Sequence, residues 1–410
     1  FLATLMDHGI EYVFANAGTD FAPIIESLVA ANQSGKKVPN FVTVPHENVA
    51  IAMAQGYFRV AGKPAAVMVH VSVGTANTIC GVMNANRDNV PVLMMAGRTP
   101  LTESGNIGSR NNSIHWGQEN FDQGGMLREF VKWDYELRTG QPVEEIVGRA
   151  LDIAMSEPCG PVYLTLPREV LGGAAPNERI LPRPRALGNA PVVPGPEVID
   201  QAARMIAEAK NPLIVTGKVG ARPGAVEALS SLAEKFAIPV VQVAAPSMLS
   251  DHPMNLGFKI DPFLGEADLV MVVESAVPWL PRNTRPNDQA KFIHVSSDPQ
   301  FANYPSRSFA MDIAVAGDPI RSLNMIEAAL GDNLDASAPE VTARRQKVTD
   351  IHDAQQVKRN ENLEKASGQM PISPPLVAAC LKPQLASLEL GELEVKYLNI
   401  CKGLEIEKFS

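Results

Sequence analysis

Residues 41–77 have the sequence FVTVPHENVAIAMAQGYFRVAGKPAAVMVHVSVGTAN, and this stretch decides the fold class. A short apolar strand over 41–44 precedes a helix with apolar residues at helical spacing, which ends at Gly62. A second strand over 65–71 is apolar except for His70, and Gly74-Thr75-Ala76-Asn77 then predicts a turn into another helix. Strand, helix and strand in this order predict a parallel sheet covered by helices.

The same alternation runs through two regions of the chain, so we expect an α/β fold with two successive three-layer α/β/α domains and mostly parallel sheets. The first domain is predicted over 1–171 and a central Rossmann-like domain over 196–331. Residues 172–195, rich in proline, glycine and alanine, predict a linker, and residues 332–410 predict a helical or irregular tail. In the central domain we expect strands at 213–216, 239–243, 269–274, 292–295 and 313–316, and helices near 197–209, 224–236 and 318–330, the last capped by Asp318.

The composition is that of an ordinary globular protein, with 410 residues of which 45% are hydrophobic and 20% charged. A net charge of −9 argues against a nucleic-acid partner. No apolar run reaches the length of a membrane span. The four cysteines show neither CxxC pairing nor metal-ligand spacing, which predicts a reducing, cytoplasmic location. We expect Cys80 and Cys159 to be small core residues.

Two ionisable residues follow strands of the first domain. Glu47 lies in the first turn of a helix, where an acidic residue can simply complement the helix dipole. The same position, after a strand, is where open α/β sheets bind ligands, so Glu47 is also a candidate functional carboxylate. His70 is either a satisfied core histidine or a catalytic side chain at the same sheet edge.

Two turns beside these residues are further candidates. In Asn16-Ala17-Gly18-Thr19-Asp20, we expect Asp20 to cap the following helix. Gly74-Thr75-Ala76-Asn77 could present backbone N–H groups to an anion, or could be no more than a tight turn.

Taken together and in order, these segments resemble the thiamine diphosphate-dependent enzymes of the acetolactate synthase and benzoylformate decarboxylase type. The similarity covers roughly residues 1–330. It is carried by the turn after Tyr12-Val13-Phe14, by the segments His46-Glu47-Asn48-Val49-Ala50 and Gly74-Thr75-Ala76-Asn77, and by Asn89-Val90-Pro91-Val92 and Gly160-Pro161-Val162-Tyr163-Leu164. The resemblance implies that the first domain binds the pyrimidine half of thiamine diphosphate.

The resemblance also implies roles for individual residues. In the family the glutamate that matches Glu47 hydrogen-bonds N1′ of the cofactor's aminopyrimidine and so activates the cofactor. His70 matches a histidine of the benzoylformate decarboxylase branch, and Gln118 matches a glutamine near the active site of acetolactate synthases. The cofactor-binding residues implied by the matching segments are Ala17, Gly18, Thr19, Glu47, Gly74, Thr75 and Asn77.

The family's third domain, which holds the diphosphate through Mg²⁺, has a Gly-Asp-Gly turn and a later Asn-Asn pair that we do not find. We therefore expect that domain to be missing, no metal ligands within this chain, and weak cofactor binding by the chain alone. A separate chain could supply the domain, because the family's active site lies between two subunits of a homodimer or higher oligomer. Some relatives hold FAD in the central domain, but FAD is not expected here because the glycine-rich fingerprint is absent.

Three function classes remain open. The first is acetolactate synthase-like decarboxylation and carboligation of a 2-oxo acid such as pyruvate, with benzoylformate decarboxylase-like chemistry as its alternative. The second is a non-catalytic binding or dimerisation module that keeps the fold without the chemistry. The third, a nucleotide-dependent oxidoreductase, lacks a fingerprint.

Overall fold

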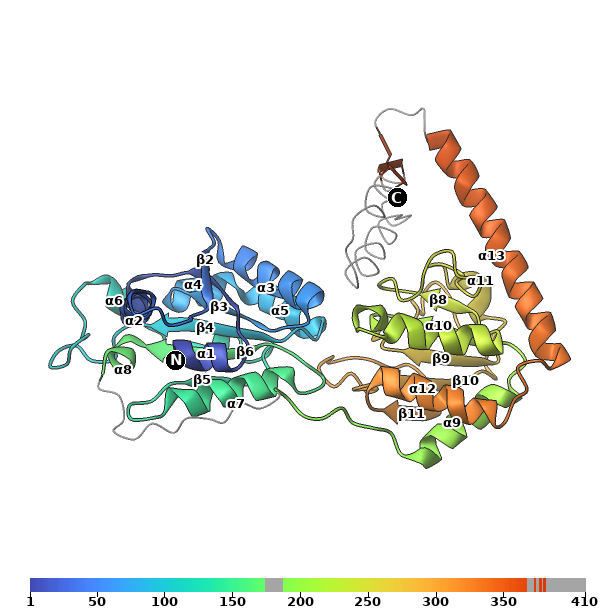
Figure 1. The fold of residues 1–410 in the computed structure, drawn as a ribbon, viewed down its shortest axis with the longest axis horizontal. Helices are drawn as coiled ribbons and strands as arrows, with labels where there is room; N and C mark the ends of the chain where they lie inside the picture. The colour runs from blue at the N-terminus through green and yellow to red at the C-terminus, as the bar shows by residue number, and fades with distance from the viewer. Residues whose placement is uncertain (174–186, 367–371, 374–375, 378, 381–410) are drawn as a thin grey trace. The chain divides into compact units, whose positions relative to one another are not determined.

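The computed structural model describes residues 1–173, 187–366, 372–373, 376–377 and 379–380. Contacts divide the chain into two compact units, a first unit of residues 1–190 and a second unit of residues 191–410 (Figure 1). The domain boundaries expected from the sequence, at 171, 195 and 331, remain predictions. Residues 381–410 of the predicted tail lie outside the described residues.

The first unit is built on a six-stranded sheet in the order β2-β1-β3-β4-β6-β5, and every strand pair in it is parallel. Its elements are α1 (Leu2–Asp7), β1 (Tyr12–Asn16), η1 (Thr19–Phe21), α2 (Ala22–Gln33), β2 (Asn40–Thr43), α3 (Glu47–Ala61), β3 (Ala65–Val69), α4 (Val71–Asn77), α5 (Ile79–Arg87), β4 (Val92–Arg98), α6 (Ile114–Gly117), η2 (Gly124–Met126), β5 (Asp134–Glu136), α7 (Val143–Met155), β6 (Val162–Pro167) and α8 (Arg168–Gly172).

Two separate cores make the first unit three-layered. Successive residues of a strand point to opposite faces, and the strands β3 and β4 are buried on both, so they are apolar except for Arg98 at the end of β4. On one face Met68 packs with residues of α1, α2 and α7, such as Leu151. On the other, Val67 packs with residues of α3 and α5, such as Ile51.

Helix α3 leaves several apolar side chains outside these cores. Its buried positions include Ala50, Ile51 and Ala54, whereas Val49 and Met53 are 47% and 38% exposed.

The expectation that Cys80 and Cys159 are small core residues was wrong for Cys80, which is exposed on α5, while Cys159 is half-buried.

The second unit contains a five-stranded parallel sheet in the order β11-β10-β9-β7-β8. Its elements are α9 (Pro196–Glu208), β7 (Pro212–Thr216), η3 (Val219–Ala221), α10 (Ala225–Phe236), β8 (Val240–Gln242), α11 (Asp261–Leu264), β9 (Leu269–Val273), β10 (Lys291–Ser296), β11 (Ile313–Ala316), α12 (Pro319–Gly331) and α13 (Pro339–Ala366). All five expected strands and three expected helices are present. Asp318 caps α12, since its Oδ1 accepts a 2.8 Å hydrogen bond from the Arg321 N–H. The predicted α/β class with parallel sheets is thus confirmed in both units.

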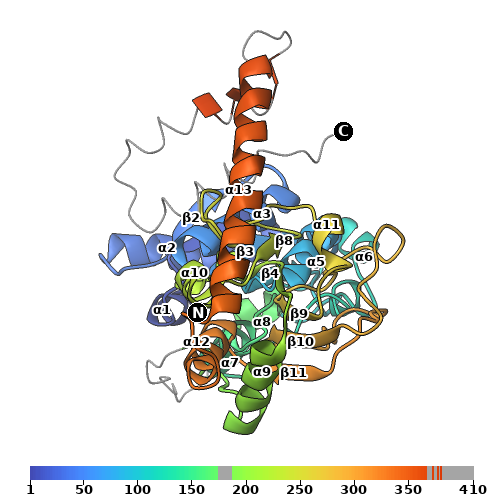
Figure 2. The ribbon, with the colours of Figure 1, turned by 90° about the vertical axis from the view of Figure 1, so that its right-hand side faces the viewer.

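Helix α13 forms the helical part of the predicted tail, and Figure 2 shows it as one uninterrupted helix. Few of its residues are buried, and arginines attach it to the second unit: Arg344 donates to the backbone oxygens of Ala237 (3.0 Å) and Phe236 (2.8 Å) at the end of α10. These contacts satisfy carbonyls that a helix end leaves unpaired. Among the described residues no helix is long and apolar enough to cross a membrane.

Candidate active site

The strand order of the first unit reverses between β1 and β3, because β2 lies on one side of β1 while β3 and β4 follow on the other. Open α/β sheets bind ligands outside the carboxyl ends of their strands at such a reversal. The predicted site residues lie at this edge. Ala17, Gly18 and Thr19 follow β1, Glu47 follows β2, and His70 follows β3.

Glu47 is the first residue of α3 and its side chain is turned inward, with only 9% of the residue exposed. The helix start is held by His46, whose Nδ1 accepts from the Asn48 N–H at 3.2 Å. Glu47 Oε2 accepts a 3.1 Å hydrogen bond from Asn77 Nδ2, and Oε1 has no hydrogen-bond partner among the described residues. A largely buried carboxyl group with one oxygen open can exchange a hydrogen bond or a proton with a ligand nitrogen.

His70 and Asp20 form a pair that the sequence reasoning missed. Asp20 does not cap the following helix; η1 intervenes, and α2 has no side-chain cap. Its carboxylate, 3% exposed, instead accepts from His70 Nδ1 at 2.6 Å and from the Val71 N–H at 3.3 Å. The hydrogen bond to Asp20 raises the pKa of His70 against the lowering effect of burial, and the charges of Asp20 and Glu47 add to the rise.

Two glycines make room for this pair. A Cβ atom at Gly18 would lie 2.2 Å from His70 Nδ1, and one at Gly97 would lie 1.8 Å from Asp20 Oδ2. Both distances are far below van der Waals contact, so any side chain at either position would displace the imidazole or the carboxylate. Gly18 was predicted as a cofactor-binding residue, and its backbone also packs directly against the imidazole of His70.

The prediction of a turn at Gly74-Thr75-Ala76-Asn77 was wrong, because all four residues belong to α4, which starts immediately after His70. The chain turns from β3 into α4 at Val71, whose φ of 33° is unusual for a β-branched residue. The Gly74 N–H bonds the His70 carbonyl at 2.7 Å, so it is not open to an anion. The glycine allows α4 to pack on β3, where a Cβ would lie 2.9 Å from Val69 Cβ.

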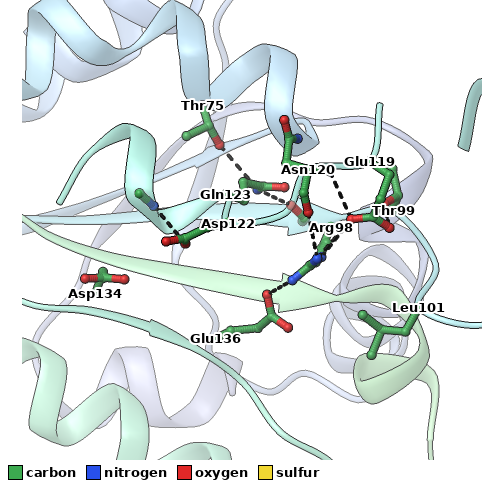
Figure 3. Close-up of polar contacts among 12 residues, drawn as sticks. Thr75, Arg98, Thr99, Leu101, Glu119, Asn120, Asp122, Gln123, Asp134 and Glu136 are labelled. Atoms are coloured by element: carbon green, nitrogen blue, oxygen red, sulfur yellow. Dashed lines mark hydrogen bonds and ion pairs between the residues drawn. The ribbon is translucent and has the colours of Figure 1, made fainter. Parts of the chain in front are cut away.

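Thr75 and Asn77 differ in their surroundings. Thr75 is fully buried, and its hydroxyl donates to the Val71 carbonyl and contacts the Tyr163 hydroxyl at 2.9 Å. Gln123 Nε2 joins this network by donating to the Tyr163 hydroxyl at 2.9 Å and to Thr75 Oγ1 at 3.4 Å (Figure 3), and it also donates to the Gly97 carbonyl at 2.8 Å. Asn77 is exposed and reaches Glu47. Thr75 therefore supports the helix, and Asn77 orients the carboxyl group.

Gln118 lies on the loop after β4, and a network of charges holds that loop. Its backbone oxygen accepts from Ser72 Oγ at 2.9 Å. The adjacent Glu119 accepts from Arg98 Nη2 at 2.9 Å and also pairs with Arg110, while Arg98 reaches Glu136 on β5 (Figure 3). Burial alone would raise the pKa of Glu119, but the hydrogen bonds from Arg98 and Thr99 lower it.

The sequence contained one signal for this network. Arg98 is a polar residue at the end of the apolar strand β4, as His70 is after β3. The remaining predicted residues, Ala17 and Thr19, are exposed at the same edge. In the described part of the chain, no group of three or more His, Cys, Asp and Glu side chains could hold a metal ion.

Two sequence models of one enzyme family match the chain. Residues 1–126 match "Thiamine pyrophosphate enzyme, N-terminal TPP binding domain", and residues 199–326 match the central domain of the same family. Thiamine pyrophosphate, abbreviated TPP, is another name for thiamine diphosphate. The chain is 30% identical to an acetolactate synthase of Arthrospira platensis over 81% of its own length and 56% of the relative's. It is 24% identical to a benzoylformate decarboxylase of Pseudomonas aeruginosa over 72% of its own length and 55% of that protein.

The fold agrees with these matches. The crystal structure of benzoylformate decarboxylase from Polynucleobacter necessarius superimposes with a TM-score of 0.69, at 22% identity, over 81% of this chain and 60% of that one. The chain thus spans little more than half the length of the two curated relatives. The two matched models together cover more than half of the chain, in the order that the family requires. The chain therefore belongs to the thiamine pyrophosphate enzyme family.

Proposed function

We propose that this chain is the pyrimidine-binding and central part of a thiamine diphosphate-dependent enzyme that acts on 2-oxo acids in the manner of acetolactate synthase. The observation that carries the proposal is the position of Glu47. Its carboxyl group is largely buried at the carboxyl edge of the sheet, beside the reversal of strand order, and keeps one oxygen open. A role confined to the helix dipole would not require burial.

The residues at this edge fit the pyrimidine half of the cofactor. We propose that Glu47 holds a proton at Oε1 against the pyrimidine ring while Asn77 fixes Oε2, that the loop Ala17-Gly18-Thr19 borders the ring, and that the buried residues Gly74 and Thr75 contribute by supporting α4 behind this edge. When bound, thiamine diphosphate supplies an electron sink for decarboxylation of the substrate. His70 and Gln118 are proposed to meet the substrate.

A benzoylformate decarboxylase-like reaction is the second candidate, and the His70–Asp20 pair favours it. An imidazole whose Nδ1 bonds a buried carboxylate can give and take a proton at Nε2. The resemblance also matches His70 to a histidine of the benzoylformate decarboxylase branch. Gln118 and the acetolactate synthase relative favour the first candidate.

We propose that the diphosphate and Mg²⁺ are bound by a domain outside residues 1–366, which a separate chain could supply, and that the chain works as a homodimer or higher oligomer. The exposed apolar residues Val49, Met53 and Val60 on α3 begin beside Glu47 and support an interface there. FAD is not part of this proposal. A cytoplasmic location remains a prediction from the free cysteines.

The test uses the purified chain with thiamine diphosphate and Mg²⁺. We expect weak cofactor binding by calorimetry and slow formation of acetolactate from pyruvate. Release of free aldehyde alone would favour the benzoylformate decarboxylase-like reaction. Glu47→Gln should lower the rate by about 10²–10⁴-fold, the usual contribution of a proton-transferring group.

Glu26→Gln is the matched control, because Glu26 is exposed on α2. It removes the same charge and should leave rate and binding unchanged. If Glu47→Gln binds and turns over like the parent, Glu47 does not have the proposed role. Tight Mg²⁺-dependent binding by the chain alone would refute the proposal of an outside domain.

A further inference from the structure

The carboxylate of Asp20 connects two strands at the point where the strand order reverses. Asp20 follows β1, whereas its two partners, His70 and Val71, follow β3. The residue is 3% exposed, although it lies in the short helix η1 and not in the sheet. A buried carboxylate is retained only when it is well paired, and both oxygens of Asp20 are used.

We propose that Asp20 is a positioning residue for His70, which holds the imidazole by Nδ1 and leaves Nε2 as the nitrogen that meets a ligand. This inference rests on the proposed function, since it assumes that the ligand site lies at this edge. It adds a residue that the resemblance to the family did not supply.

The atoms define which nitrogen can exchange a proton. A carboxylate only accepts hydrogen bonds, so the 2.6 Å contact with Oδ1 requires a proton on His70 Nδ1. Nε2 has no hydrogen-bond partner among the described residues, and the side chain is 29% exposed. The ring therefore gains and loses its proton at Nε2, where the neutral form presents a lone pair and the charged form an N–H.

The surrounding backbone is shaped to keep this geometry. Gly97 and Gly18 lie so close to the carboxylate and the ring that a side chain at either position would displace them. Val71 has a φ of 33°, and its N–H donates to Asp20 Oδ2. Sparsely populated backbone conformations persist where neighbouring contacts hold them. Asp20 thus holds both the imidazole ring of His70 and the backbone at Val71, where the chain turns into α4.

Three ionisable groups face the imidazole from different elements. Asp20 on η1 and Glu47 on α3 favour its charged form, and His115 on α6 interacts with it unfavourably. The pKa of His70 is raised as a result, with the hydrogen bond to Asp20 as the largest cause. The imidazolium should therefore persist to a higher pH than in an ordinary histidine, and loss of Asp20 should reverse this.

Nitrogen-15 NMR of the full chain with labelled histidine tests the proposal without cofactor. The chain has seven histidines, and His70→Gln identifies the resonances of His70. In the parent we expect Nδ1 to remain protonated throughout the titration while Nε2 titrates. Asp20→Asn should lower the titration midpoint by about one pH unit or more, since a nearby opposite charge shifts a pKa by roughly 1–3 units. Asp7→Asn, an exposed change on α1, should leave it unchanged.

An unchanged midpoint in folded Asp20→Asn would overturn the proposal, and so would a neutral parent that carries its proton on Nε2. The second measurement needs no variant and decides the matter even if Asp20→Asn does not fold. Gly97→Ala keeps the carboxylate but forces it from its position, so it should lower the midpoint part of the way. The proposed function is tested separately, by the effect of Glu47→Gln on cofactor binding and turnover. A failure of that test would leave the NMR result for Asp20 and His70 unchanged.

Discussion

Replacement of Glu119 by alanine should lower the free energy of unfolding of the first unit by about 2–3 kcal/mol. Glu119 accepts from Arg98 and Arg110 and from Thr99 Oγ1 at 2.8 Å. Arg98 would keep Glu136, but Arg110, with a side chain only 9% exposed, would lose its paired carboxylate.

The magnitude follows from burial. Breaking a fully buried ion pair costs about 3–5 kcal/mol, and a hydrogen bond to a charged group contributes about 1.5–3 kcal/mol. The Glu119 side chain is 26% exposed, so solvent screens part of the interaction. We therefore expect a loss of about 2–3 kcal/mol, which is less than the cost of breaking a fully buried ion pair. Glu119→Gln keeps an acceptor oxygen and should have an intermediate effect.

Urea denaturation followed by tryptophan fluorescence measures the change. In a Trp279→Phe background the two remaining tryptophans, Trp116 and Trp133, both report on the first unit. Asp122→Asn is the control on the same loop, because Asp122 pairs with Arg128 where both side chains are more than half exposed. If Glu119→Ala and the control unfold at the same urea concentration, the charge network does not hold the loop.

Three further changes concern the second unit, and fluorescence of the buried Trp279 can follow each in urea. Arg344→Ala should lower stability by about 1–2 kcal/mol, because it removes the hydrogen bonds to the end of α10, whereas Lys347→Ala on the exposed side of α13 should not. Asp318→Ala should cost about 1 kcal/mol through the lost cap of α12, and Asp318→Asn should restore most of it. Burial, helped by Arg307, lowers the pKa of His294 to about 4. The unfolded chain, in which histidine has a pKa of about 6.5, then binds more protons than the folded one, so stability should fall as pH decreases from about 6.5 towards 4 and stay level above. His294→Gln should reduce this slope, and equal slopes would contradict it.

The sheets of both units could be predicted because their strands are buried on both faces. Such strands are continuous apolar runs, as in Leu269–Val273, and glycine or proline punctuates the helices between them. Helix α13 was harder to recognise, because its apolar residues do not form a stripe and its attachment depends on arginines that reach backbone oxygens of α10. Hydrophobic periodicity does not report a helix that is held in this way.

The site was predictable to the same extent as its local contacts. His46 caps the helix that begins at Glu47 through a bond to the Asn48 N–H within the same turn, and the positions of both residues follow from the strand and helix pattern. Asp20 was misread because its local alternative, a helix cap, is a frequent role for aspartate, while its actual partner lies 50 residues away.

A polar residue at the end of an apolar parallel strand marks the ligand edge of a sheet, and both His70 and Arg98 carry this mark. They differ in the acidic partners that other elements supply. The Arg98 guanidinium forms ion pairs with two carboxylates, those of Glu119 and Glu136, whereas His70 bonds one carboxylate through one ring nitrogen. An imidazole with one nitrogen left open can bind a ligand, whereas a guanidinium paired with two carboxylates has its charge neutralised and holds the loop. The number of carboxylates around each side chain therefore distinguishes the residue that we propose to meet a ligand from the one that holds a loop, and that number depends on tertiary contacts which strand patterns do not contain.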